Sequence, residues 1–213
     1  SKDDLINKLI NADIIKTMDY GKAVTVGGIL IFGKNPERHL PQSTVTFVHF
    51  KGNHITGDLL DRKDITGTLP ELIEKTVLVI KLNLEQASTI RGLKRIEAAK
   101  FPEEVLREVV TNAVAHRDYS IYGANIRIFM FDNRIEFRSP GKLPNTVTIE
   151  KMKEGYSVAR NPFIVKYLQN LRFIDKIGSG IPMILQKMKT LKASEPLLKE
   201  DGEEFALTLF TGK

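Results

Sequence analysis

The stretch PEEVLREVVTNAVAHRDY, residues 102–119, decides the fold of the C-terminal half of the chain. Pro102 followed by Glu103 and Glu104 is typical of a helix start. Proline lacks the N–H that would go unpaired there, and acidic side chains favour the positive end of the helix dipole. Apolar residues then recur at helical spacing as far as about His116. The pattern therefore predicts an amphipathic helix with one buried face.

Three polar residues of this helix, Glu108, Asn112 and His116, are spaced four apart and share one side of it. A Glu and an Asn beside a buried face can orient a water molecule and hold a magnesium ion against a phosphate. The alternative is a helix end with polar residues at its rim, in which His116, Arg117 and Asp118 form an ion-paired cap. The spacing alone leaves both interpretations open.

Two further segments have the composition of ligand-binding turns. Residues 178–182, GSGIP, introduce another helix, and a glycine-rich helix entry exposes free N–H groups that suit a phosphate. Residues 135–144, IEFRSPGKLP, indicate a strand whose end could wall an adenine pocket. Each segment has a plainer alternative: a tight turn between helices in the first case, and a turn without a ligand in the second.

Periodicity and turn residues predict the remaining elements. The expected helices lie within residues 1–20 and at about 70–83, 148–154, 162–171 and 178–191. The expected strands lie at 23–32, 44–50, 125–131, 134–138 and 205–210, with a polar connector at 86–100. We therefore predict an α+β protein, divided into a smaller mixed α/β module at 1–90 and a second domain at 95–213.

The composition excludes several classes of protein. The absence of cysteine rules out disulfides and thiolate metal sites. No apolar run approaches the roughly 18 residues of a membrane helix, so we expect a cytoplasmic protein without membrane contacts. The net charge of +6 permits contact with nucleic acid without requiring it.

One segment imitates a phosphate-binding P-loop. Gly28, Gly33 and Lys34 have suggestive spacing, but Asn35 replaces the magnesium-binding hydroxyl and Pro36 blocks the helix that must follow. An ATP-driven helicase with P-loop motor domains is therefore not expected.

Taken together, these segments resemble the C-terminal region of RecG-related, AlbA (Schlafen)-type transcriptional regulators. The resemblance rests on residues 101–119, 135–144, 161–162 and 178–181. Residues 28–36 and 67–71 also look like the segment that follows the AlbA-type DNA-binding domain in those proteins. The resemblance implies that such a domain precedes the module at 1–90 and supplies the contact with DNA.

The same region is similar to the GHKL (HATPase-like) ATPases. This similarity implies a two-layer α/β sandwich over residues 95–213, with a layer of helices on a mostly antiparallel sheet, that binds ATP and Mg²⁺. In the comparison, Glu108 matches the general base and Asn112 the magnesium ligand. Gly178, Ser179 and Gly180 resemble the phosphate-binding glycine motif.

The resemblance implies five further cofactor-binding residues: His116, Arg117, Asp118, Ser139 and Gly141. Two departures from the family pattern matter. The acid expected three residues after Asn112 is Ala115, and Ser139 stands where the family has an adenine-binding Asp, with only Gly141 clear among the glycines of that motif. A serine can bond the amino group of adenine, but without the negative charge it discriminates less. The resemblance thus implies a degenerate site, at most a weak ATPase.

Three functions are open at this point. The first is a regulatory nucleotide-binding module whose occupancy alters DNA binding by the AlbA-type domain. The second is a ligand-free scaffold for interaction or dimerisation, which the missing Asp favours and in which the chain forms a homodimer. The third is direct DNA binding by the basic surface.

Overall fold

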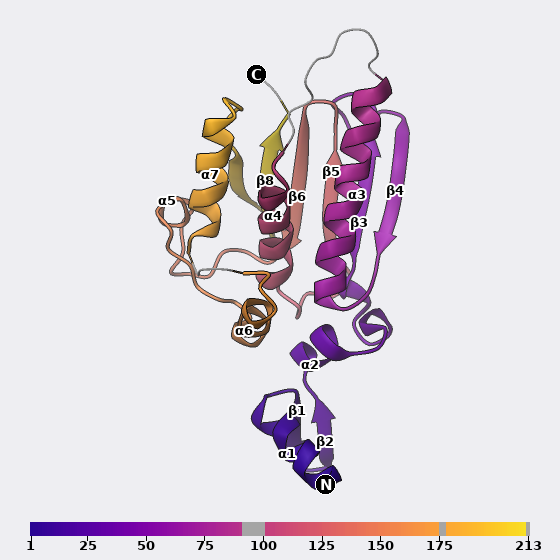
Figure 1. Cartoon of the computed structure of the whole chain (residues 1–213), viewed down its shortest axis with the longest axis vertical. Coiled ribbons are helices and arrows are strands. Elements are labelled where there is room, and N and C mark those ends of the chain that lie inside the picture. Colours follow the sequence, from indigo (N-terminus) through magenta and orange to yellow (C-terminus); the bar gives the residue numbers. More distant parts are fainter. Residues whose placement is uncertain (91–100, 175–177, 212–213) are drawn as a thin grey trace.

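The computed structural model describes residues 1–90, 101–174 and 178–211. A six-stranded sheet is covered on one side by three helices, α3 (Leu69–Ile90), α4 (Glu103–Ala115) and α7 (Gly180–Thr190) (Figure 1). α4 contacts both of the other helices and so lies in the middle of the helical layer. The architecture is the predicted α+β arrangement, a helical layer packed on a sheet.

The sheet has the strand order β4-β3-β5-β6-β8-β7. β3 and β5 run parallel and the other neighbouring strands run antiparallel, which confirms a mostly antiparallel sheet. The strands are β3 (Val45–Phe50), β4 (Leu59–Ile65), β5 (Ile126–Met130), β6 (Arg134–Pro140), β7 (Leu197–Asp201) and β8 (Glu204–Phe210). Successive residues of a strand point to opposite faces, so Ile126, Ile128 and Met130 of β5 are all buried beneath the helices.

One hydrophobic core extends across most of the chain. It contains Leu30 and Phe47 from the first half, Val109 of α4, and Leu207 of β8. β3, β4 and α3 therefore share their sheet and core with the C-terminal half, across the division expected at residues 90–95. The parallel pairing of β3 with β5 joins the two parts, and no local sequence pattern reports a pairing between strands so far apart.

The strand predicted at residues 23–32 is wrong. β2 (Gly21–Val24) ends early, and α2 (Val26–Phe32) follows it. Thr25 starts this helix, because its hydroxyl accepts a hydrogen bond from the N–H of Gly28 at 3.0 Å. A short apolar run does not distinguish a strand from a buried helix. Since α2 lies where a phosphate loop would have to be, the structure also agrees with rejecting a P-loop.

Most of the other predicted elements are confirmed. These include the 44–50 strand, the hairpin of β5 and β6, the strand β8, and the short helices α1 (Lys2–Asn11), α5 (Ile149–Lys153) and α6 (Pro162–Asn170). β4 and β7 were not predicted, because both are edge strands with mainly exposed residues and no clear alternation. α3 continues into the expected connector at 86–100, of which residues 91–100 lie outside the described part. None of the described helices, 22-residue α3 included, is apolar and long enough to cross a membrane.

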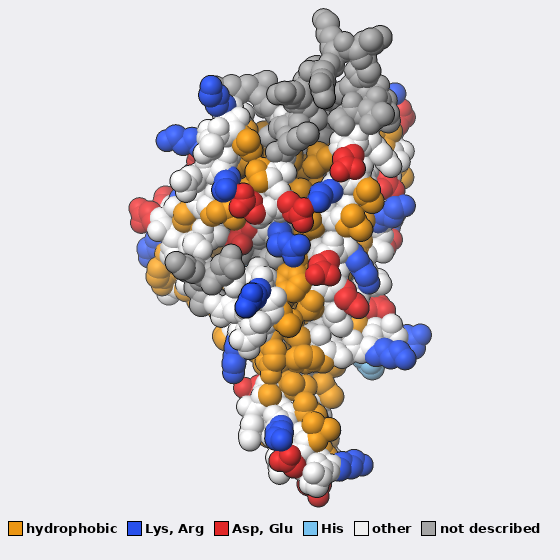
Figure 2. Space-filling view, in the orientation of Figure 1, with side chains coloured by type: hydrophobic (Ala, Val, Ile, Leu, Met, Phe, Trp, Pro, Cys, Tyr) orange, Lys and Arg blue, Asp and Glu red, His pale blue; other side chains and the backbone are white. Residues whose placement is uncertain are grey.

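The first residues form an extension beyond the end of the sheet (Figure 1). α1 contains no buried residue, and it packs beside a two-stranded hairpin of β1 (Ile15–Met18) and β2. Six large apolar side chains of residues 1–32 are exposed: Leu5, Met18, Tyr20, Val24, Val26 and Phe32. Figure 2 shows apolar side chains gathered where this extension joins the body of the protein. The first 32 residues thus carry a group of exposed apolar side chains.

Candidate functional site

A cavity of about 130 Å³ lies between α4, α7 and the sheet. β6 and β8 form one wall, and the segment between residues 141 and 160 closes the cavity from the side. Elements that are distant in the sequence therefore converge on one concave site, the usual form of a small-molecule pocket.

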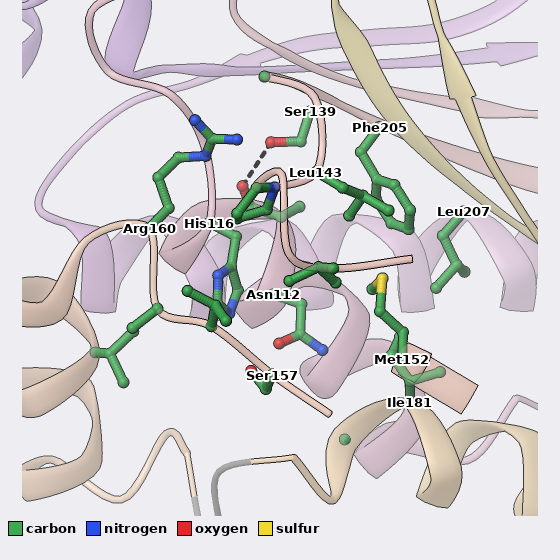
Figure 3. A pocket seen from close by; sticks show the side chains of 18 of the residues that line it. Asn112, His116, Ser139, Leu143, Met152, Ser157, Arg160, Ile181, Phe205 and Leu207 are labelled. Carbon is green, nitrogen blue, oxygen red and sulfur yellow. Dashed lines mark hydrogen bonds between the residues drawn. The ribbon is translucent and has the colours of Figure 1, made fainter. Parts of the chain in front are cut away.

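The cavity has a polar side and an apolar side (Figure 3). The polar side is formed by Asn112, His116, Ser157 and Arg160. The apolar side is formed by Leu143, Met152, Ile181, Phe205 and Leu207. This division suits an amphipathic ligand with a flat apolar part and a polar part.

α4 supplies Glu108, Asn112 and His116 to the cavity. The helix is held in this orientation because Leu106 and Val110, on its opposite side, are buried in the core. The side-chain amide of Asn112 donates a hydrogen bond to Oε1 of Glu108 at 2.9 Å. This bond links the two polar side chains and leaves the amide oxygen of Asn112 for another partner.

The glycine turn before α7 is packed against the protein itself. A Cβ atom on Gly180 would lie 1.8 Å from Oε1 of Glu108, so the carboxylate rests against the first residue of α7. Gly178 has a φ of +86°, and a Cβ there would lie 2.2 Å from the carbonyl oxygen of Gly155. Gly178 therefore needs glycine, because its φ is positive and its neighbour is a backbone atom, whereas at Gly180 the neighbour is the end of a flexible side chain.

Ser139 lies near the end of β6, opposite Phe205 of β8, and is 7% exposed. Its hydroxyl donates a hydrogen bond to the carbonyl oxygen of Ala113 in α4 at 2.8 Å (dashed in Figure 3). A hydroxyl has a single proton to donate. Ser139 can therefore offer a ligand only an acceptor.

Gly141 fixes the turn after β6. Its φ is +116°, its N–H donates to the carbonyl of Glu203 at 2.7 Å, and a Cβ would lie 2.8 Å from that of Asp118. The N–H of Asp118 in turn donates to the carbonyl of Pro140 at 2.8 Å. The loop after α4 and the turn after β6 are thus locked together at the cavity wall.

Asp118 holds Arg160 in place. Its carboxylate accepts hydrogen bonds from the hydroxyl and N–H of Ser120 and forms an ion pair with Arg160 at 3.1 Å. The hydrogen bond from the Ser120 hydroxyl, together with these other contacts, keeps the pKa of Asp118 below its ordinary value. Arg160 also donates to the carbonyl of Lys142. Asp118 therefore acts behind the cavity wall, through Arg160.

Arg117 is completely buried and does not line the cavity. Its guanidinium donates to the backbone carbonyls of Asp118, Ile121 and Ala124 at 2.5, 2.9 and 2.5 Å. It also lies over the ring of Tyr119, 4.9 Å from the centroid. The geometry gives Arg117 a structural role in the loop after α4.

His116 ends α4, and its pKa lies below the ordinary 6.5 because burial and the nearby charge of Arg160 both disfavour its protonation. Below about pH 6.5 the unfolded chain therefore binds more protons at this residue than the folded chain. We expect the free energy of unfolding to fall as the pH decreases from about 7.5 to 5.5. Urea denaturation across this range should show a smaller fall for His116→Gln, and an unchanged fall in that variant would contradict the assignment.

The structure places seven predicted site residues around the cavity: Glu108, Asn112, His116, Ser139, Gly141, Gly178 and Gly180. Arg117, Asp118 and Ser179 do not line it. The binding, catalytic and metal roles assigned to these ten residues stay predictions.

Several lining residues escaped prediction, and Arg160 is the most important. It stands alone before Asn161-Pro162, and an isolated arginine at a helix entry carries no local signal. Asn161 gives an indirect one, because its side chain donates to the carbonyls of Ala115 and Arg117 at 2.9 and 2.8 Å and so ties this segment to the end of α4.

No three His, Asp or Glu side chains gather as a metal site within residues 1–90, 101–174 and 178–211. A magnesium ion near Asn112 would therefore need oxygen ligands from a bound phosphate or from water.

Residues 123–209 match a protein-family model. Its description is "Putative ATP-dependent DNA helicase recG C-terminal". This RecG C-terminal-like region reaches from just before β5 into β8 and includes Ser139, Gly141 and the glycine turn, whereas Glu108 and Asn112 lie before it. The match supports the RecG-related, HATPase-like part of the resemblance. The AlbA-type and Schlafen-type parts stay predictions.

A solved structure shares the fold of the chain. The crystal structure of the DIP2311 protein from Corynebacterium diphtheriae has a TM-score of 0.72 and 20% sequence identity, over 97% of this chain. The chain spans only 40% of the length of that protein. The search of curated proteins found no match. The RecG C-terminal-like region thus belongs to a fold that includes β3, β4 and α3.

Proposed function

We propose that the cavity binds an adenine nucleoside or nucleotide, as a regulatory module. The observation that carries the proposal is the convergence of the polar side of α4, Ser139 and the glycine turn on one cavity. The family match supports it, because its description names ATP dependence and its range contains two of these three parts.

The apolar side of the cavity suits a purine ring. Leu143, Phe205 and Leu207 offer apolar surface beside Ser139. Because the hydroxyl proton of Ser139 is engaged by Ala113, the residue accepts a hydrogen bond from a ligand. Adenine presents an amino group at the position where guanine presents a carbonyl oxygen. Ser139 therefore favours adenine.

The polar side fits a ribose better than a triphosphate with magnesium. Asn112, Ser157 and Arg160 can bond hydroxyl groups. Asn112 offers one amide oxygen to a metal, and Glu108 lies against the start of α7, where phosphates would be expected. We therefore propose binding of the nucleoside portion and derive no hydrolysis step.

The proposal extends to regulation of transcription, on the resemblance alone. Ligand occupancy would alter DNA binding by an AlbA-type domain in the whole protein. Direct DNA binding by this chain has only its net charge of +6 in its favour.

Ligand binding can be tested by calorimetry and thermal shift with adenosine, AMP and ATP, each with and without magnesium. A ligand at about a hundred times its dissociation constant should stabilise the fold by ~2.7 kcal/mol. Ser139→Ala should weaken binding about tenfold, since it removes the acceptor. Thr208→Ala is the matched control, because it removes a mostly buried hydroxyl from the opposite face of β8. Absence of binding by all three ligands would refute the proposal.

An interaction scaffold is the second candidate function. The exposed apolar side chains of residues 1–32 favour it, since α1 has no buried residue and a two-stranded hairpin is marginal on its own. Light scattering over a range of concentrations tests this candidate, and a monomer throughout would contradict a homodimer.

A further inference from the structure

The segment that closes the cavity continues directly into α6. Arg160, just before this helix, and Val165, within it, both line the cavity. Between them, the side chain of Asn161 donates to the carbonyls of Ala115 and Arg117 and so fixes the segment at the end of α4. A ligand that contacts α4 and this segment together must leave before α6 can move away from α4. Such a ligand therefore stabilises the arrangement in which α6 is docked.

α6 presents a second, aromatic side to the N-terminal part of the chain. Phe163 and Tyr167 are about one helical turn apart, with their ring centroids at 4.6 Å, whereas Ile164 and Leu168 are buried in the core. A Cβ on Gly27 of α2 would lie within 2.7 Å of two ring carbons of Phe163. α2 therefore packs directly on this ring, at the same end of the sheet as α6 (Figure 1).

Tyr167 supplies two further contacts. Its ring meets that of Phe32 edge to face, with the centroids 5.2 Å apart. Its hydroxyl donates to the carbonyl of Ala12, at the end of α1, at 3.2 Å. One short helix thus contacts the cavity on one side, and α1 and α2 on the other.

The part of the chain before α2 has little stability of its own. None of residues 1–25, here called the N-terminal extension, is buried. The extension consists of α1 and the hairpin of β1 and β2, and a two-stranded hairpin is marginal by itself. A unit with so few buried contacts opens locally at low cost in free energy. Its position therefore depends on the contacts that α2 and α6 make with it.

We propose that α6 couples the cavity to the N-terminal extension, so that an adenine nucleoside or nucleotide in the cavity holds the extension against the body of the protein. The inference rests on the proposed function, because it describes the regulation exerted by the ligand of the same cavity. Packed side chains and hydrogen bonds that form and break together carry coupling between two sites. By reciprocity, a docked extension favours ligand binding by the same factor.

Hydrogen exchange followed by mass spectrometry tests the inference on the whole chain. The probe is whichever of adenosine, AMP and ATP binds most tightly in calorimetry, at about a hundred times its dissociation constant. It should slow exchange in residues 12–25 by at least about tenfold and at most about a hundredfold, which is the limit set by mass action at this concentration. Residues 59–65 are the internal control. They form the edge strand β4, away from α6, and their exposed edge amides should exchange at an unchanged rate.

Phe163→Ala is the variant that interrupts the contact between α6 and α2. Phe163 does not line the cavity. With the probe at the same excess over the variant's own dissociation constant, the slowing in residues 12–25 should be at least about fivefold smaller than in the wild type. Phe129→Ala is the matched control. It removes a ring of similar partial burial from the sheet face opposite the helices, and should leave the slowing at the wild-type level.

Tyr167→Phe is a milder variant that keeps the inference testable if Phe163→Ala does not fold. It keeps both ring contacts and removes only the hydrogen bond to Ala12. Loss of one such bond should reduce the slowing about two- to tenfold.

A wild-type protein that binds the probe without slower exchange in residues 12–25 would overturn the inference. So would slowing at the wild-type level in Phe163→Ala, or in Tyr167→Phe if the first variant does not fold. Each of these results would leave ligand binding intact. Failure of adenosine, AMP and ATP to bind the wild type would instead refute the proposed function, and the inference with it.

Discussion

Arg117→Met is expected to lower the free energy of unfolding by about 3–5 kcal/mol. The substitution leaves the partly buried carbonyls of Asp118, Ile121 and Ala124 without their donor. Each unpaired buried group costs on the order of 1–3 kcal/mol. Relief of the buried charge, whose burial lowers the pKa of Arg117, offsets only part of this loss. Urea denaturation at neutral pH measures the change.

Arg107→Met is the matched control for this prediction. Arg107 lies on the same helix, but its side chain is 38% exposed and its contact with Glu103 is long, at 3.7 Å. Loss of such a surface pair costs below about 1 kcal/mol. Similar losses in both variants would show that the loop after α4 does not depend on the buried guanidinium.

Gly178→Ala is expected to cost about 2–4 kcal/mol of stability. A residue with a side chain is strained at a φ of +86°, and the new Cβ would lie 2.2 Å from the carbonyl oxygen of Gly155, a backbone atom that cannot move alone. The two segments must therefore separate at the rim of the cavity, which Gly178 lines. Urea denaturation reports the loss, and calorimetry should show weaker adenosine binding by this variant.

Gly202→Ala separates the cost of the positive φ from the cost of the contact with Gly155. Gly202 also has a positive φ, +64°, but a Cβ there would meet nothing within 4 Å. This control should lose only about 1 kcal/mol, the cost of the backbone conformation. Equal losses in the two variants would mean that the contact between Gly155 and Gly178 contributes nothing.

Much of the secondary structure was predictable because its signals are local. Pro102 and two acids mark the start of α4, and Asp132-Asn133 joins the predicted hairpin. The strand predicted at 23–32 was wrong because the local signal there is ambiguous: a short apolar run fits either a strand or a helix. The segment forms a helix, and the hydroxyl of Thr25 caps its start by accepting a hydrogen bond from the N–H of Gly28. β4 escaped prediction because an edge strand with exposed charges carries no clear alternation.

The candidate site was predictable in its parts and not in its arrangement. Glu108 and Asn112 were expected on one side of a helix, and they lie there because four residues are close to one helical turn. Arg117 and Asp118 were expected to touch the ligand, yet neither lines the cavity. Their neighbours in space are carbonyls of the next loop and Arg160, which the local pattern does not report.

By itself, the sequence determined most of the helices other than α2, the hairpin and the polar side of α4, because caps, turns and periodicity act within a few residues. Only the tertiary structure decided that β3 pairs with β5, that Gly178 meets Gly155, and that Glu108 rests against Gly180. These contacts join residues far apart in the chain, and their distances follow from how whole layers pack.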